Sequence, residues 1–257
     1  MKPRQDEFID YSVIRYNAAS NSFVDDHKFT SIECSLDIYL NGNTLTTSLC
    51  SPGDHEDLIV GILAQMGKIR TIDDISKLEI DEENFIAYVE IMTNSNSELR
   101  ITNYELPTVR FNAADILACA DKLLGQLAAT HNVTNGVHSG VIFDGHDILV
   151  FREDIGRHNV FDKLYGWALR NKVDLTDKII VFSGRCSSEM MMKIGRMGIS
   201  AVAAKSVPTT LSINIAKKLG VTLIARMTPG SFCIYTNPER IINSEFGIRN
   251  AELGVTK

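Results

Sequence analysis

Residues 151–159 bring together side chains that bind anions and transfer protons. The segment reads FREDIGRHN, and its candidate ligand-binding residues are Arg152, Asp154, Gly156, Arg157, His158 and Asn159, with Asp162 one turn later. It stands where an expected strand passes into an expected helix over residues 156–170. Guanidinium groups form paired hydrogen bonds with phosphates, and a glycine lets the backbone approach a ligand closely. We therefore predict a ligand site here, with a solvated, charge-paired helix start as the alternative.

A second turn, residues 183–188, follows the expected strand 178–182 and precedes another expected helix. Its candidate residues are Ser183, Gly184, Arg185, Ser187 and Ser188. A serine hydroxyl can cap the helix start, and the free N–H groups there attract a phosphate together with an arginine. The turn lacks the Gly-Lys-Ser/Thr ending of a Walker sequence. A phosphate-binding turn and a plain capping turn therefore stay open as equal interpretations.

A third turn follows the expected strand 200–204 and carries Lys205, Ser206 and Thr209 at the start of an expected helix. His138, which precedes another expected strand, is a weaker candidate. In an α/β sheet the carboxyl ends of the strands and the N-termini of the following helices form one crevice. We therefore expect the three turns to open onto a common pocket for an anionic ligand.

The five cysteines, Cys34, Cys50, Cys119, Cys186 and Cys233, are scattered without CxxC spacing. This pattern is typical of reduced, mostly buried thiols, so we predict neither a zinc site nor any other metal site. Cys186 stands at a helix start, which lowers the pKa of a thiol. It is therefore the candidate catalytic cysteine, with a packing role as the alternative.

The order of the expected elements predicts the fold that positions these turns. After Gly136 strands alternate with single helices, and a parallel return between strands requires such a crossover. We predict an α/β fold whose three-layer core of mostly parallel strands spans residues 108–257. Residues 1–107 are expected to form a smaller α+β part, with a hairpin at Asn41-Gly42, a helix that starts at Asp54, and loops with a short helix over 73–84.

Charge and hydropathy narrow the classes of function. A formal net charge of −6 over 257 residues argues against a nucleic-acid-binding surface, which needs a concentrated basic face. No apolar run approaches the roughly 20 residues that span a bilayer, and residues 1–10 are polar and acidic, unlike a signal sequence. We therefore expect a cytoplasmic protein with no membrane and no nucleic-acid partner.

Taken together, these blocks resemble the ordered motifs of the FdhD-type formate dehydrogenase accessory proteins, the FdhD/NarQ family. The resemblance extends from about residue 33 to residue 240 and includes the helix at 52–67 and the tail at 230–236. It implies a cytidine-deaminase-like core and a homodimer. It also implies that the candidate residues bind the guanine nucleotide parts of bis-molybdopterin guanine dinucleotide, which GDP mimics. Family members pass sulfur from a cysteine desulfurase to the molybdenum centre destined for formate dehydrogenase.

The cysteine pair of that family is missing from this sequence. Family members carry CxxC on the loop before the helix that here begins at Asn112, whereas residues 101–110 read ITNYELPTVR. A persulfide relay requires a nucleophilic thiolate. Either Cys119 or Cys186 takes over, or the protein binds the cofactor without sulfurating it, and we favour cofactor binding or delivery.

Two other functions stay open. His158 and Asp162 are four residues apart on an expected helix, where the carboxylate could fix the imidazole tautomer for a nucleotide or phosphoester hydrolase. The third possibility is a scaffold that only docks partner proteins.

Overall fold

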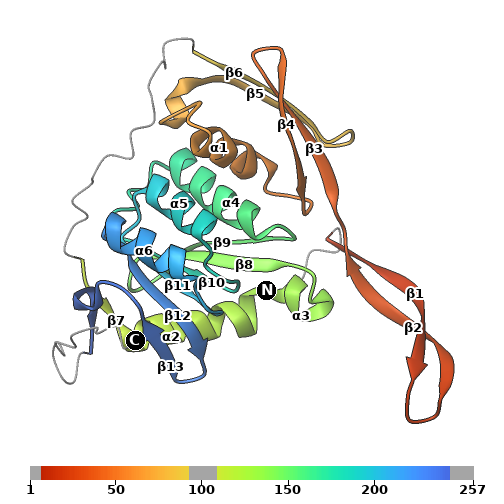
Figure 1. Cartoon of the computed structure of the whole chain (residues 1–257). Helices are drawn as coiled ribbons and strands as arrows, with labels where there is room; N and C mark the ends of the chain where they lie inside the picture. The colour runs from red at the N-terminus through yellow and green to blue at the C-terminus, as the bar shows by residue number, and fades with distance from the viewer. Residues whose placement is uncertain (1–6, 93–108, 244–257) are drawn as a thin grey trace.

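The computed structural model describes residues 7–92 and 109–243 and has a six-stranded sheet at its centre (Figure 1). The strands lie in the order β13-β12-β11-β10-β8-β9. Their bounds are His138–Phe143 (β8), Ile148–Asp154 (β9), Ile179–Phe182 (β10), Ala201–Ala204 (β11), Thr222–Thr228 (β12) and Ser231–Ile234 (β13). The pairs β10–β11 and β11–β12 are parallel, and β8–β10, β8–β9 and β12–β13 are antiparallel. The α/β class is confirmed: β9, β10, β11 and β12 run in one direction, and β8 and β13 run in the other.

Tight turns account for two of the antiparallel pairings. Between β8 and β9, the Asp144 carboxylate accepts hydrogen bonds from the backbone N–H groups of His146 and Asp147, at 2.8 and 2.7 Å. Between β12 and β13, Gly230 adopts a positive φ of 76°. Helix crossovers, which permit parallel pairing, join β10 to β11 and β11 to β12.

Helices cover both faces of this sheet, so the three-layer core is confirmed (Figure 1). One face is covered by α4 (Arg157–Arg170), α5 (Ser188–Met197) and α6 (Thr210–Leu219), and the other by α2 (Ala113–Lys122) with the π-helical turn Leu123–Leu127. Alternate residues divide between these layers: Ile180 packs in the α4–α6 cluster, and Val181 packs in the α2 cluster. The likeness to cytidine deaminases stays a prediction.

The N-terminal part is a second sheet backed by one helix. Its strands lie in the order β4-β3-β6-β5, with bounds Cys34–Leu40 (β3), Asn43–Cys50 (β4), Ile75–Asp81 (β5) and Ile86–Ile91 (β6). α1 (His55–Gln65) packs its apolar side chains against this sheet. The α+β expectation is therefore confirmed for the residues described, although the expected boundary at 107/108 falls within residues 93–108, outside the described ranges.

Two local expectations in this part have opposite outcomes. The hairpin at Asn41-Gly42 is confirmed, because both residues adopt the positive φ angles of a tight turn, 49° and 78°. The expectation of loops and a short helix over 73–84 is wrong for 75–81, which form the edge strand β5. An edge strand leaves one side in solvent, so it tolerates the charged residues that suggested a loop.

A two-stranded arm extends from the body and had no counterpart in the sequence predictions (Figure 1). Its strands, β1 (Phe8–Asn17) and β2 (Ser22–Ser31), pair only with each other. Large apolar side chains are exposed along it: Ile9, Tyr11, Ile14, Tyr16, Phe23, Val24 and Phe29. The remaining short elements are α3 (Ala129–Thr134), the paired strands β7 (Phe111–Asn112) and β14 (Ile241–Ile242), and the 3-10 turns Ile72–Asp74 and Pro238–Arg240.

Two glycines set the distance between the N-terminal part and the core. A Cβ atom added to Gly61 of α1 would lie 1.8 Å from the backbone oxygen of Asp162 in α4. A Cβ atom added to Gly166 of α4 would lie 1.8 Å from the backbone oxygen of Asp57 in α1. Backbone against backbone leaves no flexible side chain that could yield. The two helices therefore cross in direct contact at this reciprocal glycine pair.

We predict that Gly61→Ala destabilises the protein by about 3 kcal/mol, because α1 and α4 must separate to admit the methyl group. The matched control is Gly125→Ala, where the added Cβ meets nothing within 4 Å. That variant should match the wild type or gain up to about 1 kcal/mol from helix propensity. Urea unfolding followed by circular dichroism measures both. Equal stability of the two variants would contradict the crossing.

Candidate functional site

The direction of the strands brings the candidate turns to one edge of the central sheet. β9 and β10 run the same way with β8 antiparallel between them, so the start of β8 lies beside the ends of β9 and β10. The backbone N–H of Ser139 donates to the Ser183 hydroxyl at 2.8 Å, and that of Ser183 donates to the Ser139 carbonyl at 2.9 Å. The N–H of Ser206 donates to the Gly184 carbonyl at 3.3 Å. The second and third turns and the β8 start are therefore in direct contact.

His138 and Gly184 form the floor between these turns. The His138 ring lies 6.0 Å from that of Phe182, measured between centroids. A Cβ atom on Gly184 would lie 2.6 Å from the Phe182 ring and 3.2 Å from His138 Nδ1, so only glycine fits. Burial, reinforced by the nearby charge of Arg157, lowers the pKa of His138. The imidazole is therefore neutral at pH 7 and can both donate and accept a hydrogen bond.

Several predicted ligand residues of the first turn are instead occupied by protein groups. The buried carboxylate of Asp154 accepts from the backbone N–H groups of Ser51 at 3.1 Å and Gly156 at 2.8 Å, and lies 2.8 Å from the ammonium nitrogen of Lys163. The side-chain amide of Asn159 donates to the same carboxylate at 2.8 Å. These residues hold the turn in place.

Arg152 has a similar structural role. Its guanidinium donates twice to Oδ2 of the buried Asp57 in α1, at 2.8 and 2.5 Å. Arg170 of α4 donates to the other oxygen of that carboxylate at 2.6 Å. Arg152 therefore ties β9 to the N-terminal helix, and the structure gives its charge a protein partner rather than leaving it for a ligand.

The predicted pair of His158 and Asp162 is wrong. The Asp162 carboxylate binds the ammonium group of Lys193 in α5, with Oδ2 at 2.6 Å. The Nε2 atom of His158 lies 3.3 Å from a carboxylate oxygen of Glu189, also in α5. Burial raises the pKa of Asp162 and lowers the pKa of His158. Both residues therefore connect α4 to α5, and the hydrolase hypothesis loses its carboxylate–imidazole pair.

Six of the predicted residues lie along this edge of the sheet and bring together positive charge and backbone N–H groups. We call them the basic rim: Arg157, Gly184, Arg185, Ser188, Lys205 and Ser206. Arg185 and Lys205 are exposed, and Ser188 opens α5. Ser187 and Thr209 cap α5 and α6, accepting from the N–H groups of Met190 at 3.5 Å and Ser212 at 3.2 Å. The buried Nε of Arg157 has no hydrogen-bond partner among the described residues. The arrangement suits an anion.

Sequence reasoning missed Arg226. It lies in β12 at the same edge, its side chain is exposed, and its N–H donates to the Ser206 carbonyl at 3.3 Å. The available signal was an arginine directly after the apolar run 221–225.

The predicted low pKa of Cys186 is wrong. Burial raises the pKa of Cys186 to about 12, because its side chain faces the apolar cluster under α4–α6. Burial likewise raises the pKa values of Cys50 and Cys119 to about 12, and Cys233 is exposed. Residues 101–108 of the cysteine-free segment 101–110 lie outside the described ranges. None of the buried thiols is a ready nucleophile at neutral pH.

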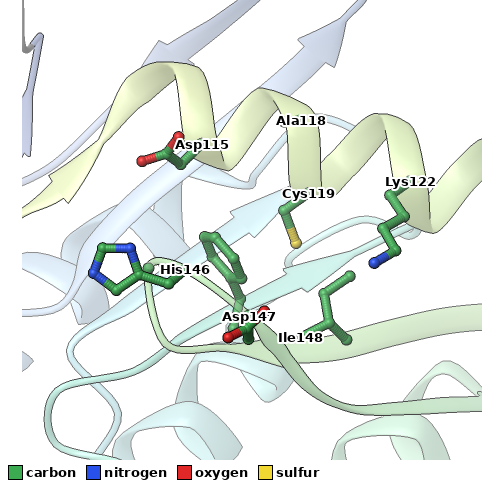
Figure 2. A pocket seen from close by; sticks show the side chains of 9 residues that line it. Asp115, Ala118, Cys119, Lys122, His146, Asp147 and Ile148 are labelled. Atoms are coloured by element: carbon green, nitrogen blue, oxygen red, sulfur yellow. The ribbon is translucent and has the colours of Figure 1, made fainter.

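A hollow of about 270 Å³ lies at the opposite edge of the sheet, where β8 ends and β9 begins (Figure 2). The sulfur of Cys119 points toward it, with Lys122 of α2 and His146 of the β8–β9 turn at its sides. It is separate from the basic rim. Among residues 7–92 and 109–243, no three His, Cys, Asp or Glu side chains gather as metal ligands. No helix in those ranges has both the length and the apolar character of a membrane span.

Comparisons with known proteins agree on one family. The model of the FdhD/NarQ family matches residues 31–105 and 90–242. The sulfur carrier protein FdhD of Geobacillus kaustophilus (strain HTA426) is 35% identical over 243 residues, covering 86% of this chain and 92% of that protein. The protein of the same name from Bacillus subtilis (strain 168) is 35% identical over 253 residues, covering 89% and 95%.

A solved structure gives the same fold. The crystal structure of a proposed formate dehydrogenase accessory protein from Desulfotalea psychrophila matches with a TM-score of 0.81 at 23% identity. It covers 91% of this chain and 99% of that one. Because the family model covers most of the sequence and the relatives match over nearly their whole length, the chain belongs to the FdhD/NarQ family.

Proposed function

We propose that this protein is a formate dehydrogenase accessory protein that binds the guanine nucleotide parts of bis-molybdopterin guanine dinucleotide as cargo. The observation that carries the proposal is the basic rim: Arg157 opens α4, and Arg185 and Lys205 precede the N-termini of α5 and α6, in a chain of net charge −6. Cations and free N–H groups concentrated on one edge attract phosphate. The family supplies the identity of the cargo.

The residues present fit a nucleotide phosphate. A buried donor without an acceptor costs about 1–3 kcal/mol, and the Nε of Arg157 is such a donor among the described residues. A phosphate oxygen would accept from it. Neutral His138 and the close-packed Gly184 give the phosphate a narrow floor. The cargo brings the molybdenum chemistry of the recipient enzyme, and this chain's residues bind and orient it.

We also propose that formate dehydrogenase receives the cofactor, and that the protein works in the cytoplasm as a homodimer. This part rests on the names of the relatives, which are sulfur carrier proteins FdhD, and on the accessory protein of like fold. A cysteine desulfurase is the partner that sulfur transfer would require.

The cysteines of this chain do not support sulfur transfer. Between Cys50 and Cys119 the sequence contains no cysteine, so the loop before α2 has no thiol to accept sulfur. The pKa of Cys119 and of Cys186 is raised to about 12, which leaves almost no thiolate at pH 7. Binding and delivery of the cofactor is therefore the activity that the side chains support.

We predict that GDP binds at the basic rim. Replacing Arg157 and Arg185 together by alanine should weaken GDP binding about 100-fold, because each charge-assisted hydrogen bond contributes about 1.5–3 kcal/mol. Lys217→Ala, which removes an exposed charge from the far end of α6, should leave the affinity unchanged. Titration calorimetry measures all three proteins. A wild-type protein without GDP affinity in the millimolar range would exclude the proposed function.

We predict that incubation with a cysteine desulfurase and cysteine leaves the mass of the native protein unchanged, without the gain of about 32 Da that one sulfur atom adds. Iodoacetamide at pH 7 should modify the exposed Cys233 first, and unfolding should expose the other four thiols. Intact-mass spectrometry reads both experiments. A stable sulfur adduct on Cys119 or Cys186 would restore the sulfur-carrier function to this chain.

A further inference from the structure

The two-stranded arm is attached to the body at α3 (Figure 1). We call the attached end the foot of the arm and define it as residues 7, 31 and 32. The hydroxyl of Thr130 in α3 donates to Oε2 of Glu7 at 2.5 Å. The hydroxyl of Ser31 donates to Oγ1 of Thr134, also in α3, at 2.8 Å. The position of the arm therefore depends on the position of this helix.

Helix α3 in turn depends on a carboxylate from the central sheet. Six residues do not form a stable helix in isolation, and the N-cap residue of α3, Ala128, has no side chain that can cap it. The carboxylate of Glu153 in β9 supplies the missing acceptor. It accepts from the backbone N–H groups of Thr130 and His131 and from the Thr130 hydroxyl. That hydroxyl has one proton to donate, and the carboxylates of both Glu153 and Glu7 lie beside it.

Two buried oxygen atoms at this position have no hydrogen-bond partner among the described residues. One is Oε1 of Glu153, and the other is Oγ of Ser139. Ser139 and Glu153 are directly opposite each other on β8 and β9, so their side chains share one face of the sheet. An ionised carboxylate has no proton to donate, whereas a protonated carboxyl group donates to a hydroxyl or to a second carboxylate. The arrangement therefore favours a proton on Glu153.

The surrounding charges favour the same protonated form. Burial, reinforced by the Glu7 carboxylate, raises the pKa of Glu153 to about 7, although the hydrogen bonds from α3 partly oppose this rise. Lys163 of α4 donates to the backbone carbonyl of Glu153 at 3.2 Å, but its ammonium group is paired with Asp154. The Nδ1 atom of His131 is bonded to a backbone carbonyl at 2.7 Å. Within residues 7–92 and 109–243, no cation forms an ion pair with the Glu153 side chain.

We infer that protonated Glu153 holds the arm against the body, and that ionisation of Glu153 releases the foot of the arm. Ionisation places two negative charges beside the single Thr130 hydroxyl, and separating them relieves the repulsion. Glu153 is fixed in the central sheet, whereas among the described strands β1 and β2 pair only with each other, so the arm is the part that moves.

The direction of the pH dependence follows from the sign of the shift. The pKa of Glu153 with the foot attached, about 7, lies above its ordinary value of 4.5. The attached state therefore binds more protons than the released state, and its advantage is lost as the pH rises through about 7. The arm is held in mildly acidic solution and loosened in mildly alkaline solution. This behaviour requires no ligand.

Hydrogen exchange of the ligand-free protein at pH 6 and pH 8, corrected for the intrinsic exchange rates, tests the inference. The reporter amides are Ile32, which donates to the Glu7 carbonyl at 2.9 Å, and Asn135, which donates to the His131 carbonyl at 2.7 Å. Their protection should fall about tenfold from pH 6 to pH 8, because an acid with these two pKa values shifts the equilibrium by that factor.

Three variants assign the effect to the carboxylates. Glu153→Gln donates a hydrogen bond as the protonated acid does but does not ionise, so the foot should stay protected at both pH values. Glu7→Gln removes the second carboxylate, which lowers the pKa of Glu153, so the loss of protection should move to lower pH. The matched control is Glu83→Gln, which changes an exposed carboxylate between β5 and β6 and should behave like the wild type.

Equal protection of Ile32 and Asn135 at pH 6 and pH 8 in the wild type would overturn the inference. An equal fall in the wild type and in Glu153→Gln, or stronger protection at pH 8, would overturn it as well. If Glu153→Gln does not fold, as judged by circular dichroism, Glu7→Gln decides the question. A midpoint that moves to lower pH in that variant supports the inference, and an unchanged midpoint contradicts it.

Discussion

The carboxylate of Asp154 is fully buried at the end of β9, and four donors converge on it. One is the ammonium group of Lys163, which is itself buried. A buried charge without its partner costs several kcal/mol, so neither member of this pair can be removed alone without a large loss of stability. The other donors come from Ser51, Gly156 and Asn159, which belong to the chain before α1 and to the start of α4. A single carboxylate thus fixes the turn from which Arg157 extends, and it joins that turn to the N-terminal part.

Helix caps and the order of strands and helices were predictable from the sequence, because they depend on residues that are close together in the chain. The hydroxyls of Ser187 and Thr209 cap helices because capping needs only the next few residues. The common edge of the three turns followed from strand–helix alternation. The partners of Asp162 and Arg152 did not, because Lys193 and Asp57 are distant in sequence and only packing brings them close. The prediction of a lowered pKa for Cys186 was wrong for the same reason. The sequence shows its position at a helix start but not its burial under α4–α6. The β1–β2 arm also depends on pairing beyond local range.

The acidic residues of this chain are used differently from its basic ones. Asp57, Asp154 and Asp162 are buried and hold helices together through arginine or lysine partners. Arg185 and Lys205, which have no carboxylate partner among the described residues, lie on one edge of the sheet, where helix N-termini add to the positive potential. An overall negative charge is therefore compatible with an anion site, since these cations concentrate positive potential locally at one edge. The net charge of the whole sequence says little about the local potential in a pocket for one nucleotide.

The glycines at 61 and 166 differ from every residue of the basic rim in what could replace them. The atom that meets an added Cβ at each position is a backbone oxygen, which every amino acid carries. No second mutation in a neighbouring side chain can make room, so the usual route of compensated drift is closed. Descendants of this sequence could exchange their cargo or their chemistry at the rim while these two glycines stayed fixed. The pair would then record common ancestry of the architecture, independent of what each descendant came to do.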